Sequence, residues 1–422
     1  MVLYAALASR QRGVLSRLIG EFFARAHVWP SVEVWGDGGK VSPAQLAEGK
    51  YEWVMVACHA GEGLARRVGD GLGLSMGPRE ILGAEALINS PFRTDLIITP
   101  GKLRALTGPI GSPPIIVSRS DQLIVASSLP LLTAGRPSTV PPDSILEVDY
   151  ETMTYEQRKS LTSKESSLPA LLEESAAQLV ELLHQSVKSS VAGRCALLFS
   201  GGLDSSILAK IVSDSGLEPL LISVGVQGSH DLAVARSAAS LLGLDLLEVS
   251  LSEERVAESL RYLNNVIPLS GPMDMALAIM MYEGSRASSS ENRRQVVTGQ
   301  GADELFGGYK KYLRISEASE RLDSAMKDDL SALWRVGIPR DWAASAAAGC
   351  MLTMPYLDPR VVSMALNTPV WLKISGGIRK LVLRKAAELL GLPHELVIRE
   401  KKAAQYGSGL DKCIRRIRKR RV

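Results

Sequence analysis

At 422 residues, with 46% hydrophobic and 22% charged side chains, the chain has the composition of an ordinary folded protein, which excludes the disordered and collagen-like classes. This length predicts about two or three domains, each able to bury its own core. The formal net charge of +4 arises near the end of the sequence, because outside residues 411–422 the chain carries 42 basic and 44 acidic side chains.

Cysteine usage and hydropathy narrow the class further. The cysteines are too few and too scattered for a disulfide framework, and none has the near neighbour of a metal-binding pair: Cys58, Cys195, Cys350 and Cys413. No apolar run approaches the roughly 18–20 residues of a membrane span, and no basic stretch precedes the apolar N-terminal residues. We therefore expect a cytoplasmic protein without a membrane segment.

The first part of the sequence is rich in short strands. Apolar runs at 53–57, 95–98, 114–117 and 123–126 are separated by Gly and Pro, which predicts a mostly antiparallel sheet with a few helices such as 11–26. A polar segment rich in Ser and Thr follows, as is typical of a linker. We expect an N-terminal domain at residues 1–155, a linker at 156–170 and a C-terminal domain at 171–422.

The C-terminal domain alternates helices with strands. A predicted helix at 169–190 is followed by strands at 195–199, 219–224 and 246–249, with helices at 205–213 and 231–242 between them. Strands separated by helices predict an α/β fold with a parallel sheet. Beyond about residue 310 the pattern is mainly helical, which predicts a helical extension of that domain.

The strand that ends at Phe199 leads directly into Ser200-Gly201-Gly202-Leu203-Asp204-Ser205-Ser206 and a predicted helix. Gly and Ser at a helix N-terminus let backbone N–H groups surround phosphate oxygens, and the helix dipole favours their negative charge. The string is neither a Walker loop nor a dinucleotide fingerprint. A carboxylate beside a bound anion needs a divalent cation between them, so Asp204 predicts a magnesium-bound triphosphate. A tight turn with a capping Ser and Asp is the structural alternative.

A second Gly-rich loop follows the apolar strand at 295–297 and contains Asp303. Ligands of open α/β sheets bind at the carboxyl ends of the strands. We therefore expect the carboxylates of Asp204 and Asp303 to share Mg²⁺. The structural alternative is a Gly-rich entry into a helix.

The two loops together resemble a known family. Residues 200–206 match the pyrophosphatase-loop signature of ATP-dependent adenylating enzymes, and Gly301-Ala302-Asp303-Glu304-Leu305-Phe306-Gly307-Gly308-Tyr309 is similar to the second signature of the asparagine synthetase and β-lactam synthetase branch. Further strings that fit are Ser223-Val224-Gly225, Met354-Pro355-Tyr356-Leu357-Asp358, Leu383-Arg384-Lys385-Ala386, and Arg399 with Lys401. These strings cover about residues 175–409, so the basic run at 412–421 lies beyond them.

The resemblance implies a reaction: a substrate carboxylate attacks the α-phosphorus of ATP, pyrophosphate leaves, and an amine displaces AMP from the acyl-adenylate. It also implies residue roles, with the phosphates on Ser200, Gly201, Gly202, Asp204, Ser205 and Ser206, Mg²⁺ at Asp204 and Asp303, adenine at the main chain of Leu198 and Val224, and ribose near Gly299. Lys401 and Arg340 match family cations that stabilise the reacting groups. For each, a solvated surface cation is the alternative, and we interpret His230 as a cap or surface residue.

The sequence departs from the family in its N-terminal half. Glutamine-hydrolysing members carry a nucleophilic Cys directly after the initiator Met, where this chain has Val2, and Cys58 lies too far inside the chain to have a free α-amino group as its base. The Asn-Gly-Glu glutamine-binding string is not found, although residues 114–117, 124–127 and 141–148 resemble the last strands of that domain. We expect a degenerate domain of the N-terminal-nucleophile (αββα) type without glutaminase activity.

A second departure is Gln300, which stands where asparagine synthetases usually have Glu. A neutral amide can orient an attacking amine but cannot accept its proton.

Three functions stay open. The leading one is an asparagine-synthetase-like ligase of amino-acid biosynthesis that uses ATP and Mg²⁺ to join a carboxylic acid, aspartate being favoured, to ammonia or an amine. An enzyme that amidates or cyclises another carboxylic acid fits Gln300 and the missing glutaminase. A tRNA-acting enzyme would use the basic run, but that run lacks interleaved aromatic residues, so nucleic acid is not favoured as a partner. A separate glutaminase or amine-supplying partner and a homodimer also stay open.

Overall fold

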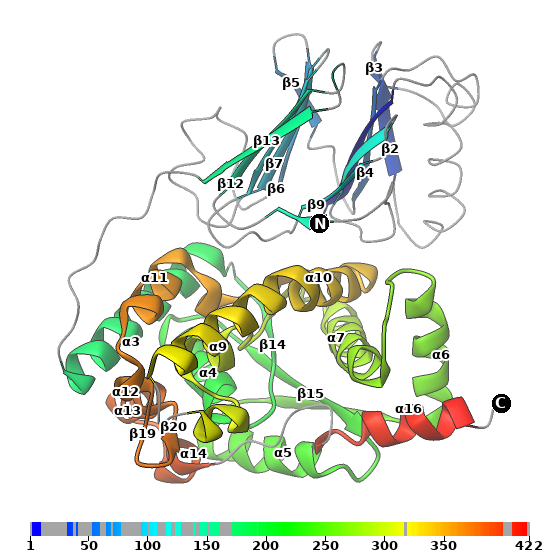
Figure 1. Cartoon of the computed structure of the whole chain (residues 1–422). Coiled ribbons are helices and arrows are strands. Elements are labelled where there is room, and N and C mark those ends of the chain that lie inside the picture. The colour runs from blue at the N-terminus through cyan, green and yellow to red at the C-terminus, as the bar shows by residue number, and fades with distance from the viewer. Residues whose placement is uncertain are drawn as a thin grey trace. The chain divides into compact units, whose positions relative to one another are not determined.

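The computed structural model describes residues 2–9, 32–36, 39–40, 53–59, 65–68, 71–76, 94–99, 102–107, 115–119, 123–127, 138–140, 144–149, 152, 154–159, 171–191, 193–315, 319–399 and 407–419. The chain forms two compact units. The first comprises Met1–Thr162, Asn264–Pro268 and Ile338–Gly349, and the second comprises Ser163–Leu263, Leu269–Gly337 and Cys350–Val422. The ribbon of each unit is drawn in Figure 1.

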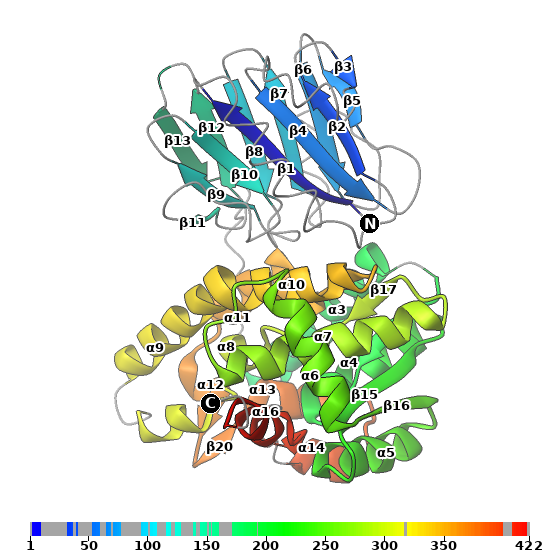
Figure 2. The ribbon, with the colours of Figure 1, turned by 90° about the vertical axis from the view of Figure 1, so that its right-hand side faces the viewer.

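Two antiparallel sheets form the described part of residues 1–162, in agreement with the antiparallel character that the sequence predicts. The first sheet contains, in spatial order, β11 (Ser138–Thr139), β9 (Ile116–Arg119), β10 (Leu123–Ser127), β1 (Val2–Ser9), β4 (Trp53–His59), β2 (Val32–Gly36) and β3 (Gly39–Lys40). The second contains β13 (Thr154–Lys159), β12 (Ser144–Asp149), β8 (Lys102–Thr107), β7 (Thr94–Thr99), β6 (Gly71–Met76) and β5 (Ala65–Val68). The sheets stand side by side in Figure 1 and overlap in the turned view of Figure 2, as two layers do.

Side-chain alternation explains how the second sheet buries one face. Along β12, Leu146 and Val148 are buried while Glu147 is half-buried on the other face, and β8 alternates in the same way. Glu147 stands opposite Arg104 in the register, and the Arg104 Nε atom donates to the Glu147 carboxylate at 2.8 Å. The sheet therefore has one apolar face and one charged face, as period-two strands require. The predicted helix at 11–26 lies outside the described residues, and β13 occupies the first residues of the predicted linker at 156–170.

The second unit is built on a five-stranded parallel sheet, which confirms the predicted α/β fold of this part. Its spatial order is β16 (Leu246–Leu251), β15 (Leu220–Val226), β14 (Ala196–Leu198), β17 (Gln295–Val297) and β18 (Met351–Thr353). The apolar strands are buried as parallel strands covered by helices should be. In chain order, the sheet grows from β14 in one direction and then from β17 in the other. The strand order thus reverses between β14 and β17, and this is where open α/β sheets bind ligands.

Helices surround this sheet in both views. Between its strands along the chain lie α4 (Leu203–Asp214), α5 (His230–Leu242), α6 (Glu253–Asn264), α7 (Pro272–Ser290), α8 (Ala302–Phe306) and α9 (Ser319–Ala332). Before or after them lie α3 (Leu172–Ser190), α11 (Pro359–Asn367), α12 (Val370–Lys373), α13 (Leu381–Leu389), α14 (His394–Ile398) and α16 (Leu410–Lys419). Helix α10 (Ile338–Ala347) belongs to the first unit. The remaining elements are three short turns and a hairpin. The turns are η2 (Lys310–Arg314), η3 (Leu333–Gly337) and η4 (Pro355–Leu357), and the hairpin consists of β19 (Ile374–Ser375) and β20 (Ile378–Arg379).

The basic run near the C-terminus is part of a packed helix. In α16, Leu410, Cys413, Ile414 and Ile417 are buried, and the helix packs against α7. The basic side chains lie on its exposed face: Lys412, Arg415, Arg416, Arg418 and Lys419. Helix α16 is therefore packed within the second unit. In the part of the chain that the structure describes, no helix combines the length and apolar character that a bilayer crossing requires.

Candidate active site

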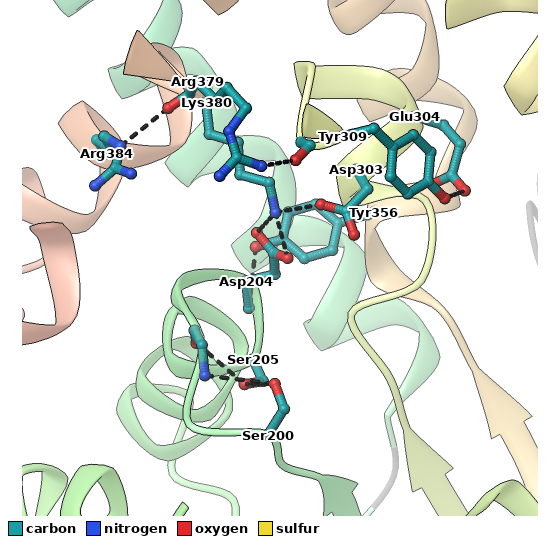
Figure 3. A network of polar contacts seen from close by, with 12 residues as sticks. Ser200, Asp204, Ser205, Asp303, Glu304, Tyr309, Tyr356, Arg379, Lys380 and Arg384 are labelled. Atoms are coloured by element: carbon teal, nitrogen blue, oxygen red, sulfur yellow. Dashed lines mark hydrogen bonds and ion pairs between the residues drawn. The ribbon is translucent and has the colours of Figure 1, made fainter. Parts of the chain in front are cut away.

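The loop after β14 leads directly into the N-terminus of helix α4. Residues Ser200–Gly202 connect the strand to α4, whose N-cap is Gly202. The Ser205 hydroxyl donates to the Gly202 carbonyl at 3.1 Å and lies 3.3 Å from the Ser200 hydroxyl, so the two serines brace the loop (Figure 3). Gly201 has φ +68°, and a Cβ there would lie 2.8 Å from the Val234 carbonyl oxygen. The sequence therefore needs Gly at this point to place the free N–H groups of α4 at the sheet edge.

The loop after β17 lies beside the first loop. A Cβ built on Gly299 would lie 3.4 Å from the Asp204 Cβ atom, so the backbone after β17 borders the first turn of α4. Asp303 stands in the first turn of α8. The following Gly308 approaches so closely that a Cβ there would lie 1.8 Å from the Asp303 Oδ1 atom and 2.4 Å from the Lys380 Cε atom. The two predicted carboxylates therefore come from neighbouring strand ends, as the sequence predicts.

Asp204 and Asp303 meet on one ammonium group. The Lys380 Nζ atom lies 2.7 and 2.6 Å from the two carboxylate oxygens of Asp204 and 2.5 Å from the Asp303 Oδ1 atom (Figure 3). The Lys380 and Asp204 side chains are 9% and 5% exposed, whereas Asp303 is 24% exposed and so opens toward solvent. Burial alone would lower the pKa of Lys380, but the charges of Asp204 and Asp303 raise it above its ordinary value. The group is therefore an ammonium at neutral pH.

The backbone that carries Lys380 is held by its neighbours. Lys380 lies between β20 and α13 with φ +60°, which is unusual for a residue with a side chain. The Arg384 Nε atom donates to the Arg379 carbonyl at 2.9 Å, and an Arg379 N–H donates to the Gly308 carbonyl. These contacts fix the turn on both sides of Lys380. The sequence analysis did not identify this residue, and its one signal is a basic residue directly before the apolar helical spacing of 381–390.

Tyr356 is a buried residue that contacts the backbone of Asp204. It is fully buried, packs edge-on against Phe306, and its hydroxyl donates to the Asp204 carbonyl at 3.1 Å. Burial, with the charges of Asp204 and Asp303, raises the pKa of Tyr356 well above its ordinary value, so it stays a neutral donor. Its role is to position the first turn of α4.

The donor set at this edge fits a magnesium–nucleotide complex. Mg²⁺ is usually held by one or two carboxylates together with phosphate and water oxygens. Among the described residues no group of three or more His, Cys, Asp or Glu side chains could hold a metal, so Asp204 and Asp303 would supply the protein's share. Three buried hydroxyls at the carboxyl edge also have no hydrogen-bond partner in the described part of the chain: Ser206, Ser229 and Thr298. Unpaired buried hydroxyls are costly, which indicates a polar ligand here.

Glu304, next to Asp303, carries a proton in the neutral range. Burial raises the pKa of Glu304 to about 7, against the hydrogen bond from Tyr309, whose hydroxyl lies 2.5 Å from the Glu304 Oε1 atom. Because the folded protein holds this proton more tightly than the unfolded chain does, the contribution to the free energy of unfolding is fully present below about pH 4.5 and is lost as the pH rises through about 7.

We therefore expect Glu304→Gln, which cannot ionise but still accepts from Tyr309, to be more stable than the wild type by about 1–3 kcal/mol near pH 8 and equal to it near pH 4.5. Urea unfolding over a pH series measures this difference. Glu258→Gln, on the exposed side of α6, is the control and should show no such trend. A stability difference that does not change with pH would contradict the assignment.

Comparison with known proteins decides the family. The family model described as asparagine synthase matches residues 178–337 and 315–420, more than half of the chain. The chain belongs to the asparagine synthase family. The match runs through α16, beyond the last of the matching sequence strings near residue 409. The apolar positions of α16 pack on α7, so in this chain the matched segment ends within the packed second unit.

The alignments with relatives in this family cover only part of each relative's length. A Methanocaldococcus jannaschii protein named as a putative glutamine-hydrolysing asparagine synthetase is 32% identical in an alignment 297 residues long, which covers 61% of this chain and 54% of that protein. Escherichia coli asparagine synthetase B (glutamine-hydrolysing) is 28% identical in an alignment 250 residues long, which covers 55% of this chain and 45% of the relative. The chain thus spans about half the length of these relatives. An NH3-dependent NAD synthetase structure from Campylobacter jejuni aligns with a TM-score of 0.30 at 14% identity, covering 60% of this chain and 85% of that one.

In this asparagine synthase family chain, the residues expected at the adenine lie together. Leu198 ends β14 and Val224 lies in the adjacent strand β15. Both side chains point at Gly284 of α7, where a Cβ would lie 2.4 Å from Leu198 and 3.3 Å from Val224. The predicted ribose residue, Gly299, lies at the neighbouring strand end beside Asp204.

Neither of the two predicted catalytic cations is among the described residues of the second unit. Lys401 lies outside the described residues. Arg399, just before it, donates to the Gly201 carbonyl at 3.1 Å, so the chain that leads to Lys401 is tied to the phosphate loop. Arg340 belongs to the first unit, where it is buried and its Nε atom donates to Asp341 at 2.7 Å. His230 begins α5 with a 57% exposed side chain, as its interpretation as a cap or surface residue requires.

Proposed function

We propose that this asparagine synthase family protein is an ATP-dependent carbon–nitrogen ligase. It adenylates a substrate carboxylate, aspartate being favoured, releases pyrophosphate, and passes the acyl group to ammonia or an amine. The observation that carries this proposal is the buried Asp204–Lys380–Asp303 cluster beside the N-terminus of α4, at the point where the strand order of the sheet reverses. Absence of the Asn-Gly-Glu string from the 422 residues supports a nitrogen source other than glutamine.

In this proposal the acidic residues of the site would bind the metal ion, and the N–H groups, hydroxyls and Lys380 would interact with the phosphate oxygens. ATP supplies the adenylyl group that activates the carboxylate, and Mg²⁺ would be held by Asp204 and Asp303. The free N–H groups at the start of α4 and the hydroxyls of Ser200 and Ser205 would bind phosphate oxygens. Lys380 would supply a positive charge close to the phosphate oxygens, where it would stabilise the negative charge that develops in the transition state. Lys401 and Arg340 remain proposed catalytic residues on the family resemblance.

A second candidate is the amidation or cyclisation of a different carboxylic acid. Gln300 favours this candidate. Its half-buried amide lies beside the π-turn η3, since a Cβ built on Gly337 of that turn would lie 3.7 Å from the Gln300 Nε2 atom. Turns of the π type are frequent at functional sites. A neutral amide there can orient an attacking amine but cannot take its proton, so it would suit an amine that arrives unprotonated.

Exchange of labelled pyrophosphate into ATP, screened over a set of carboxylic acids, tests both candidates because it reports adenylation before any nitrogen donor is needed. We expect exchange that depends on a carboxylic acid, with aspartate among the active ones. Asparagine formation from aspartate and ammonium would exclude the second candidate. Exchange with another acid but not with aspartate would exclude the first, and no exchange with any acid would contradict adenylation altogether.

A further inference from the structure

The space between the two proposed metal ligands is taken by the chain itself. The Lys380 Nζ atom contacts three carboxylate oxygens at 2.5–2.7 Å, two from Asp204 and one from Asp303. A Mg²⁺ ion held by the same oxygens would lie about 2.1 Å from them, in the same gap. Two cations that close would repel each other strongly in a buried site. The ammonium and the metal therefore compete for one position (Figure 3).

The hydrogen bonds of Lys380 are also fully used. A lysine ammonium has three N–H donors and no acceptor. Its contacts with the Asp204 and Asp303 oxygens match these donors in number. In this arrangement Lys380 has no N–H left for a phosphate oxygen. Contact with a nucleotide therefore requires the ammonium to leave at least one carboxylate.

Departure of the ammonium alone would be unfavourable. It would leave the Asp204 and Asp303 carboxylates facing each other in a site where Asp204 is almost fully buried, and an uncompensated buried charge is strongly destabilising. Another cation has to replace it. Movement is confined to the side chain, because the contacts of Arg379 and Arg384 hold the backbone of the turn while the four-carbon stem of Lys380 can rotate.

We propose that Lys380 holds the place of the divalent cation in the nucleotide-free protein and yields Asp204 and Asp303 only when cation and nucleotide enter together. This inference rests on the proposed function, since it takes the two carboxylates as ligands of a nucleotide-bound cation. Its consequence is an order of binding. A free divalent cation has to displace Lys380 without any phosphate to receive the ammonium, so it binds weakly. Nucleotide removes this obstacle, and the coupling is reciprocal because binding free energies are linked.

Binding of Mn²⁺ to the nucleotide-free full-length chain tests the proposal, with the electron paramagnetic resonance signal of free Mn²⁺ as the readout. We expect Lys380→Met, which keeps the length of the stem and removes the charge, to bind Mn²⁺ at least about tenfold more tightly than the wild type. Adding Asp303→Asn to that variant should abolish the gain. Lys385→Met, in the helix α13 that follows Lys380, is the control: Lys385 is partly exposed and paired with Glu173, so this variant should bind Mn²⁺ as the wild type does. Tight, Asp303-dependent Mn²⁺ binding by the nucleotide-free wild type would overturn the proposal.

A second measurement uses the wild type alone and so does not depend on the folding of a variant. With the methylene analogue of ATP that blocks cleavage at the α-phosphate, the protein–nucleotide complex should bind Mn²⁺ at least about tenfold more tightly than either the protein or the nucleotide alone. If the analogue binds but leaves the affinity for Mn²⁺ unchanged, the inference fails while adenylation still stands. If the analogue does not bind at all, the inference and the proposed function both fail.

Discussion

Asp303→Asn is expected to abolish ATP–pyrophosphate exchange in a protein that still folds. Asn is close to Asp in size but has no charge, so this change removes one half of the carboxylate pair that faces Lys380. The proposed transition state spreads negative charge over phosphoryl oxygens, so loss of a metal-binding carboxylate should lower kcat/KM by about 1000-fold or more, ~4 kcal/mol. Asp204→Asn should have an effect of the same size, because both carboxylates contact the same point.

The matched control is Asp214→Asn. Asp214 lies in the last turn of α4, the helix that begins with Asp204, and pairs with Lys210 in an exposed i,i+4 ion pair. Pairs of this kind contribute little to stability, so neither exchange nor unfolding should change measurably. Thermal unfolding of all three variants shows whether they fold. An Asp303→Asn protein that unfolds normally and keeps more than about a tenth of the wild-type exchange rate would refute the metal assignment.

The features that could be predicted correctly from the sequence are those that depend on local patterns. Asp204 and Asp303 could be placed together because each follows a buried strand within a Gly-rich loop, and parallel strands end at one edge of a sheet. The β14–α4 and β17–α8 connections have that arrangement. Helix α16 could have been found in the same way. Leu410, Cys413, Ile414 and Ile417 follow the i, i+3, i+4, i+7 spacing of a buried helical face, but the seven basic residues around them were interpreted only as a run of charge.

Lys380 could not be placed by such patterns. It lies 176 residues from Asp204 in the sequence, and its position depends on how the hairpin β19–β20 and helix α13 pack onto the sheet. Its left-handed backbone conformation is one that residue propensities assign to Gly or Asn. Propensity and periodicity describe neighbours along the chain, whereas this residue is defined by the carboxylates it meets across the fold. The raised pKa of Glu304 belongs to the same class, because burial of that side chain causes it.

Gly308→Ala is expected to be the most damaging change that adds only a methyl group. The new Cβ would lie 1.8 Å from the Asp303 Oδ1 atom and 2.4 Å from the Lys380 Cε atom, far inside contact distance. The backbone cannot retreat easily, because the Gly308 N–H donates to the Asp303 carbonyl at 2.8 Å and the Gly308 carbonyl accepts from Arg379. The Asp303 carboxylate has to rotate away from Lys380 instead.

Displacing a reacting group by about 1 Å can cost about 100-fold in rate, so Gly308→Ala should lower the exchange rate by about 100-fold or more and the free energy of unfolding by about 1–3 kcal/mol. Exchange kinetics and urea unfolding measure the two effects separately. Gly271→Ala is the matched control, since Gly271 has extended backbone and open space where its Cβ would be. A destabilisation of this size leaves nearly all of the Gly308→Ala protein folded. The expected loss of exchange activity therefore comes from the displaced carboxylate and not from unfolding. Exchange by Gly308→Ala within about threefold of the wild type would show that Asp303 does not need its present orientation, and the carboxylate pair would then have to act from another geometry.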